Sequence, residues 1–144
     1  MPSISSSIDR EIFIVAAPEA VFPYLVDPTL MARWIGLSHE LDPRPGGGLR
    51  IEISDGNVAL GLYTEVVPPR RVAFTWGWQS QDGSLAALAP GTSLVEIDLE
   101  PKDGGTLLRL RHSRLPSDLI ERHADRWLFY LTRLQSRAVT RTID

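Results

Sequence analysis

The sequence predicts a single α+β domain in which one long C-terminal helix covers an antiparallel sheet of about six or seven strands. Three observations lead to this fold class. Apolar residues alternate with period two in several short runs that Gly- and Pro-rich turns separate. Two short helical segments follow the first run, and an apolar stripe at helical spacing occupies the C-terminal end. A length of 144 residues suits one such domain better than two.

The first strand is expected over residues 8–15. Ile8, Ile12 and Ile14 fall in one period-2 frame, which indicates a strand buried mainly on one face. The preceding residues 1–7 are rich in serine, and we expect them to be disordered.

A bent helical element is expected next. Pro18 and Pro28 each suit the first turn of a short helix, and Asp27 is placed to cap the second one. Trp34 falls at the end of that second helix. Two short helices therefore follow the first strand.

The middle of the chain predicts a meander of antiparallel strands. Asp55-Gly56 is a strong hairpin signal, and glycine or proline clusters mark the other turns. The expected strands cover residues 38–41, 49–53, 58–67, 72–78, 95–99 and 106–112. Residues 79–91 are expected to form a long loop, with apolar positions at Leu85 and Leu88. Loops of this length in a small domain are often binding loops.

The terminal helix is expected to begin at Ser117, whose side chain could cap it. The face that covers the sheet carries Ile120, Ala124, Trp127, Leu131, Leu134 and Ala138. Four arginines, at positions 122, 126, 133 and 137, are expected to be solvated. One sheet face needs a cover, and only this helix is long enough to supply it.

Composition excludes several classes of function. The formal net charge is −3, so the chain lacks the basic surface that nucleic acid or an anionic membrane would require. There are no cysteines, which removes disulfides, thiolate nucleophiles and cysteine-based metal sites. No export signal and no apolar run long enough to span a bilayer is visible. We therefore expect a cytoplasmic protein with no membrane insertion.

The familiar catalytic and cofactor motifs are missing from the sequence. There is no nucleophile elbow, no P-loop and no dinucleotide-binding glycine pattern. The histidines His39, His112 and His123 have no spacing that would make a zinc site. The sequence predicts no metal and no cofactor.

Motifs spread over nearly the whole chain resemble the START-like, or SRPBCC, superfamily, and more narrowly the branch named after the activator of Hsp90 ATPase. Their order and spacing carry the resemblance. In chain order they are Ala17-Pro18-Glu19, Asp27-Pro28, Trp34, Pro45-Gly46-Gly47, Asp55-Gly56, Gly61, Glu65, Pro68-Pro69-Arg70-Arg71, Phe74-Thr75-Trp76, Gly104-Gly105-Thr106, His112-Ser113 and Trp127.

The resemblance implies a helix-grip fold with a deep cavity between sheet and helix. Such cavities hold lipids, polyketides or plant hormones elsewhere in the superfamily. One position departs from the pattern: the family commonly has glycine before the helix tryptophan, whereas Arg126 precedes Trp127 here. We expect the pocket to differ in shape at that end.

Aromatic side chains suggest the walls of a ligand site. Large rings supply rigid apolar surface, and each indole adds one hydrogen-bond donor. Ordinary core packing would use the same residues, so both readings stay open. The candidate ligand-binding residues are Trp34, Phe74, Trp76, Trp78, Leu110, His112, His123, Trp127 and Leu131. Trp34 is expected near the entrance.

Two histidines deserve separate expectations. His112 continues the inward frame of its strand, where it could act as an acid or base or be a hydrogen-bonded core residue. His123 lies one turn before Trp127, and a place on the surface is favoured over one in the cavity. Glu65 and Arg71 flank a turn and could form an ion pair across it.

Three functions are consistent with these features. The leading one is the binding of a small apolar or aromatic molecule by a carrier or sensor, which includes lipid binding. The second is an enzyme of the polyketide cyclase, dehydratase or hydrolase type that uses His112. The third is a protein-interaction module with a chaperone partner or a second copy of the chain. The sequence favours a binding protein over an enzyme.

Overall fold

A seven-stranded antiparallel sheet curves around one long helix in the computed structural model, which describes residues 6–139. The strand order is β1-β7-β6-β5-β4-β3-β2, so each strand after β2 pairs with its predecessor, and β1 closes the sheet against β7. The strands are β1 (Ser6–Ile14), β2 (Ser38–Leu41), β3 (Gly48–Ser54), β4 (Asn57–Val67), β5 (Arg71–Ser80), β6 (Ser93–Lys102) and β7 (Gly105–Leu115). This is the predicted α+β helix-grip fold.

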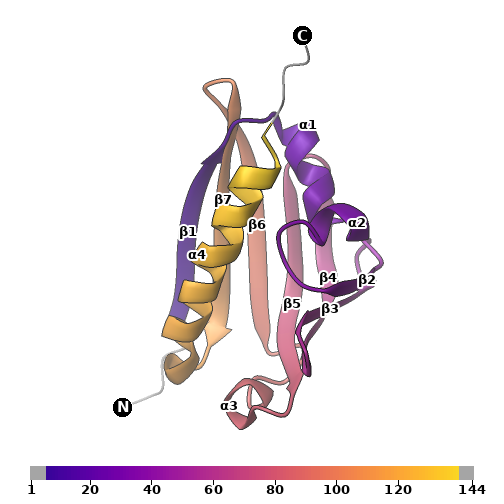
Figure 1. The fold of residues 1–144 in the computed structure, drawn as a ribbon, viewed down its shortest axis with the longest axis vertical. Coiled ribbons are helices and arrows are strands. Elements are labelled where there is room, and N and C mark those ends of the chain that lie inside the picture. Colours follow the sequence, from indigo (N-terminus) through magenta and orange to yellow (C-terminus); the bar gives the residue numbers. More distant parts are fainter. Residues whose placement is uncertain (1–5, 140–144) are drawn as a thin grey trace.

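Short helices fill the connections and one long helix covers the sheet (Figure 1). The helices are α1 (Pro18–Val21), the 3-10 helix η1 (Phe22–Leu25), α2 (Pro28–Met31), α3 (Gly83–Ala86), the 3-10 helix η2 (Ser117–Leu119) and α4 (Ile120–Arg137). Asp27 caps α2 as predicted, because its carboxylate accepts from the backbone N–H groups of Thr29 and Leu30. No helix among residues 6–139 is long and apolar enough to cross a bilayer.

Three local expectations were wrong. Ser6 and Ser7 belong to β1, because pairing of Ser6 with Leu115 extends the ladder beyond the expected start; residues 1–5 lie outside the described residues. Ser117 does not cap the terminal helix, because the chain first makes the 3-10 turn η2 there. Trp34 lies beyond α2, which ends at Met31.

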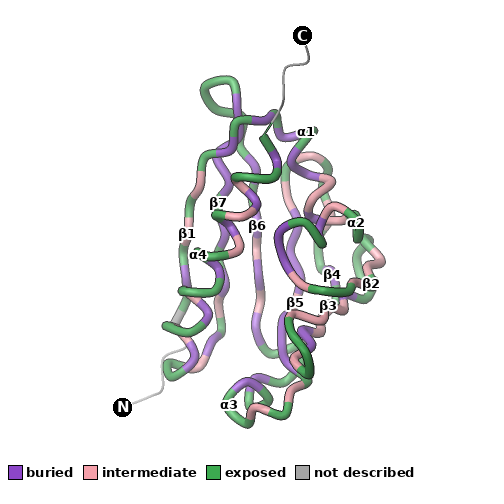
Figure 2. Tube along the Cα trace, viewed as in Figure 1, coloured by how far each residue is buried: buried purple, intermediate pink, exposed green. Residues whose placement is uncertain are grey.

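The apolar stripe of α4 faces the sheet as predicted. Trp127, Leu131, Leu134 and Ala138 are each at most 4% exposed, whereas the outward positions of the helix are exposed (Figure 2). The same alternation marks β7, where Leu108, Leu110 and His112 are buried and the intervening arginines are exposed. One core therefore lies between the sheet and α4.

The segment after β5 is less of a free loop than the sequence suggested. It contains α3, and both Leu85 and Leu88 are buried. The backbone N–H of Trp78 donates to the Leu88 carbonyl over 2.8 Å, so the segment folds back on β5. At Gly77 a Cβ atom would come within 2.3 Å of the backbone of Ala89. Glycine at this position therefore permits the close approach.

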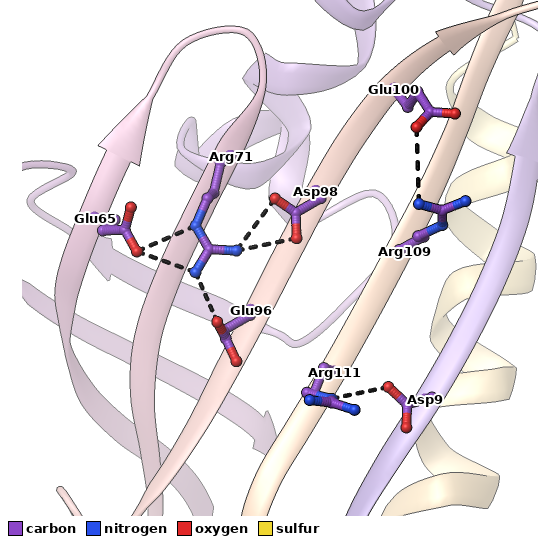
Figure 3. A network of polar contacts seen from close by, with 8 residues as sticks. All are labelled: Asp9, Glu65, Arg71, Glu96, Asp98, Glu100, Arg109 and Arg111. Carbon is purple, nitrogen blue, oxygen red and sulfur yellow. Dashed lines mark hydrogen bonds and ion pairs between the residues drawn. The ribbon is translucent and has the colours of Figure 1, made fainter.

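The opposite face of the sheet carries charged side chains (Figure 3). Arg71 is the centre of one cluster and bonds Glu65 at 3.0 Å, Glu96 at 2.7 Å and Asp98 at 3.0 Å. The pairing predicted between Glu65 and Arg71 is thus confirmed and extended. The hydrogen bonds that Arg71 donates to Glu65 and, next in effect, to Glu96 raise the pKa of its guanidinium above the ordinary value. This face is a network of ion pairs, and the aromatic residues Phe74, Trp76 and Trp78 of β5 are buried on the other face.

Candidate functional site

An open pocket of about 290 Å³ lies between α4 and the segment from α2 to β3. Trp76 and Trp78 of β5 and Leu85 of α3 contribute to its lining, together with residues from the first half of α4. The lining residues are Ile35, Ile53, Ser54, Asn57, Trp76, Trp78, Leu85, Arg122, His123, Arg126, Trp127 and Tyr130. Apolar walls with a few polar groups at one side are typical of small-molecule sites.

Three indoles form the inner wall of the pocket. The Trp76 ring lies 5.5 Å from that of Trp78, nearly perpendicular to it, and 5.3 Å from that of Trp127. All three side chains are at most 9% exposed. Strand β5 places Trp76 and Trp78 on one face because they are two residues apart. Trp127 of α4 packs against Trp76.

His123 connects α4 to β5. Its Nε2 lies 3.0 Å from Nε1 of Trp78, and its Nδ1 lies 2.9 Å from the Leu119 carbonyl oxygen. An indole N–H only donates and a carbonyl only accepts, so Nδ1 carries the proton and Nε2 accepts. Burial lowers the pKa of His123, which keeps the ring neutral. The favoured surface position was wrong: the residue is 4% exposed, because the Trp78 bond holds it against the sheet.

His112 is fully buried and both of its ring nitrogens are occupied. Trp127 donates from Nε1 to His112 Nδ1 over 3.0 Å, so the imidazole proton is on Nε2, which faces the Ser93 hydroxyl at 2.8 Å. Ser93 in turn donates to the Trp76 carbonyl. Burial, with a smaller effect of His123, lowers the pKa of His112 to about 3. The ring is therefore neutral and hydrogen-bonded within the core.

The predicted site residues separate into two groups. Trp76, Trp78, His123 and Trp127 line the pocket. The remaining five residues, Trp34, Phe74, Leu110, His112 and Leu131, are buried in the core beside it. Trp34 is 2% exposed and donates from Nε1 to the Tyr24 carbonyl over 2.9 Å, so it does not stand at the entrance as expected.

The deep cavity that the resemblance implied is filled in this chain. The space deep under the helix, which Trp34, Phe74, Trp76 and Trp127 line with their neighbours, has a volume of only about 10 Å³. That is too small for anything larger than a single water molecule. Within the described residues, the space between the sheet and α4 that is large enough for a ligand is the pocket lined by Trp76, Trp78 and Trp127.

The sequence interpretation missed the polar side of the pocket. Arg122, Arg126 and Tyr130 line it, and they recur every four residues along α4. This row runs beside His123 and Trp127, and the shared spacing was the signal that could have revealed it. Ile35, Ile53, Ser54 and Asn57 come from distant segments, and nothing local marks them as pocket residues.

The charges in this row are arranged unequally. Arg122 pairs with Asp82 beside α3 at 2.9 Å, and that hydrogen bond is the main reason why the pKa of the Asp82 carboxyl is lowered. Arg126 forms no ion pair or side-chain hydrogen bond within residues 6–139. Burial raises the pKa of the Tyr130 hydroxyl, and the nearby charge of Arg126 opposes that shift. Among the described residues, Arg122 is therefore paired with a carboxylate and Arg126 is not.

Two buried donors lack an acceptor within residues 6–139, Nε of Arg10 and Nε1 of Trp76, and of the two residues only Trp76 lines this pocket. No cluster of three or more potential metal ligands occurs within residues 6–139. The pocket thus offers donors, aromatic walls and a cation, and none of the described residues form a metal centre.

Known protein families and solved structures match nearly the whole domain. A family model described as Activator of Hsp90 ATPase homolog 1-like protein matches residues 15–138. No curated protein matches the chain. Among solved structures, an AHSA1-like protein from Rhizobium etli is 41% identical over 96% of this chain and 84% of its own, with a TM-score of 0.74.

Two further structures share the fold at lower identity. CalU16 from Micromonospora echinospora is 26% identical over 95% of this chain and 81% of its own, with a TM-score of 0.74. The Aha1 protein of Colwellia psychrerythraea, whose structure is a dimer, is 18% identical over 93% of this chain and 96% of its own, with a TM-score of 0.76.

Proposed function

Because the chain belongs to the Activator of Hsp90 ATPase homolog 1-like family, whose fold places a helix over a curved sheet, we propose that it binds a small hydrophobic or aromatic molecule in the pocket between β5 and α4. The observation that carries this proposal is the pocket of about 290 Å³ with Trp76, Trp78 and Trp127 in its wall. Aromatic rings give a ligand a large apolar contact area at a low entropic cost.

The size of the pocket limits the ligand. Pockets for drug-sized molecules measure about 300–1,000 Å³, and this one is at the small end of that range. The filled interior beyond Trp76 and Trp127 leaves no room for a long acyl chain. A molecule of one or two rings fits these limits better than a lipid.

Blocking the pocket tests the proposal. Binding of small aromatic compounds would be measured by calorimetry for the natural chain and for Ser54→Phe, which places a ring at the exposed rim. The matched control is Thr64→Phe, at an exposed position of β4 outside the pocket. We expect Ser54→Phe to weaken binding at least tenfold and Thr64→Phe to leave it unchanged. The absence of binding to the natural chain across a broad set of such compounds would refute the proposal.

An enzyme that uses His112 and a protein-interaction module are the two alternative functions. Acid or base chemistry by His112 gains no support, because both ring nitrogens bond Ser93 and Trp127 within the core. A chaperone partner or a homodimer would need an apolar surface on the outside of the domain. Co-purification of a partner in fixed stoichiometry would favour that function over ligand binding.

A further inference from the structure

The polar groups of the pocket are mostly hydrogen-bond donors. Its lining residues Arg126, Tyr130 and Trp76 each carry an N–H or O–H group, and the lining contains no aspartate or glutamate. Acceptors among the lining side chains are already engaged: Nε2 of His123 accepts from Trp78, the Ser54 hydroxyl accepts from Asn57, and the Asn57 side-chain oxygen accepts from Ser80. A ligand that matches this wall must bring acceptor atoms of its own.

The buried Trp76 indole gives independent evidence for an acceptor. The residue is 3% exposed, and its Nε1 has no partner within residues 6–139. Such donors are rare in native structures, because an unpaired buried N–H costs free energy. The other three indoles of the chain all donate to acceptors within the protein. Trp76 is the one whose acceptor remains to be supplied, and its side chain lines the pocket.

The charge in the pocket selects among acceptors. Asp82 neutralises Arg122, while Arg126 has no carboxylate partner in residues 6–139. A guanidinium is permanently charged and its planar fork matches a carboxylate with two parallel hydrogen bonds. A single uncommitted cation balances a monoanion better than a phosphate dianion.

We infer that the natural ligand of this pocket is a small aromatic carboxylic acid, whose ring packs on Trp78 and Trp127 and whose carboxylate is bound by Arg126. The inference rests on the proposed function, since it names the chemical class that the same pocket selects. Arg126 acts here as the residue that determines specificity between charged and neutral ligands.

Pairs of ligands that differ only in charge test this inference. Benzoate, 3-phenylpropionate and 2-naphthoate would be titrated by calorimetry against their neutral amides, benzamide, 3-phenylpropionamide and 2-naphthamide. The natural chain should bind at least one acid about ten- to a hundredfold more tightly than its amide, which corresponds to one charge-assisted hydrogen-bonded pair.

Variants on α4 locate the preference. Arg126→Gln should remove the tenfold or greater advantage of the acid and leave the affinity for the amide within about twofold. Arg126→Lys should restore part of it, because charge remains and the planar fork is lost. The control is Arg137→Gln, a substitution of an exposed arginine on the same helix outside the pocket, which should change neither affinity.

The outcomes separate the two proposals. If acids and amides bind equally and Arg126→Gln changes neither, the pocket binds aromatic molecules but the carboxylate inference is wrong. Tighter binding of the amides than of the acids would also show that the carboxylate inference is wrong. If no acid or amide binds the natural chain while it remains folded, the carboxylate inference is wrong, whereas the binding function fails only if the broad set of aromatic compounds also does not bind.

Discussion

Nε1 of Trp78 on β5 lies 3.0 Å from Nε2 of His123 on α4, and the reverse arrangement joins Trp127 on α4 to His112 on β7 at the same distance. In the first pair the sheet supplies the indole donor and the helix supplies the imidazole acceptor, and in the second pair these roles are reversed. The two imidazole rings lie 5.3 Å apart, almost perpendicular. These crossed pairs fix the position of α4 over the sheet and hold the inner wall of the pocket.

A double-mutant cycle should detect the Trp78–His123 bond in the stability of the fold. Trp78→Phe removes the donor and leaves Nε2 of His123 without a partner. His123→Leu removes the acceptor and leaves Nε1 of Trp78 without a partner. We expect a coupling free energy of about 1 kcal/mol between them in urea unfolding. Additive effects of the two substitutions would show that the bond contributes nothing to stability.

Acidification should destabilise the protein through His112. Its pKa in the folded state is about 3, below the ordinary value near 6.5, so the unfolded chain binds a proton first as the pH falls. The contribution of the neutral His112 ring to the free energy of unfolding is fully present above about pH 6.5 and is lost progressively down to about pH 3. This residue alone should lower the free energy of unfolding by about 2 kcal/mol between pH 7 and pH 5.

His112→Gln provides the comparison for that pH dependence. The neutral amide can still accept from Trp127 and donate to Ser93, so the variant should fold with a cost of about 1–3 kcal/mol at pH 7. Its loss of stability between pH 7 and pH 5 should be about 2 kcal/mol smaller than that of the natural chain. Equal losses in the two proteins would mean that His112 is not the group that titrates.

Ligand binding should leave a signature at the Trp76 indole. Of the four tryptophan Nε1–H signals in a nitrogen-correlated NMR spectrum, the one that Trp76→Phe removes should move furthest downfield when 2-naphthoate is added, because its donor gains an acceptor. Naphthalene, which has no acceptor, controls for ring-current shifts. The same shift with both compounds would show that Trp76 does not bond the ligand.

Gly77→Ala should loosen the segment that carries α3. The added Cβ would lie 2.3 Å from the backbone of Ala89, so the segment must move away, at a cost of about 1–3 kcal/mol. Gly83→Ala in α3 is the control, because a Cβ there meets nothing within 4 Å. It should be neutral or slightly stabilising, since alanine is the better helix former. Thermal unfolding of both variants checks the contrast.

Arg71→Gln should cost more than the loss of an ordinary surface ion pair. It leaves Glu65, Glu96 and Asp98 close together without their shared cation, and we expect about 1–2 kcal/mol in urea unfolding, less in 1 M salt. Arg111→Gln removes one exposed pair with Asp9 and should change the stability much less. Equal costs for the two substitutions would contradict a cooperative cluster.

Local sequence patterns predicted the strands and the terminal helix well. Alternation such as that of Leu108, Leu110 and His112 sets which face is buried, and signals such as Asp55-Gly56 set where the chain reverses. These features depend on residues that are close in sequence. Ser117 failed as a cap because the same local signal also suits a 3-10 turn.

The site was predicted only in part, because it depends on how far α4 is shifted and rotated over the sheet. Sequence spacing places His123 and Trp127 on one side of the helix, but it does not say that Trp78 comes within bonding distance of His123. Neither does it show that Arg126, one residue before Trp127, reaches the pocket. Such contacts are set by tertiary packing and by segments far apart in the chain.

Two of the three indoles in the wall, Trp78 and Trp127, are each held by a hydrogen bond to a buried histidine. A binding site made of restrained side chains loses little conformational entropy on association, so more of the contact energy appears as affinity. Because Trp78 and Trp127 are restrained, the pocket cannot change its shape to bind a larger ligand. A protein built in this way should discriminate sharply by the size of the ligand and tolerate few substitutes for the molecule it recognises.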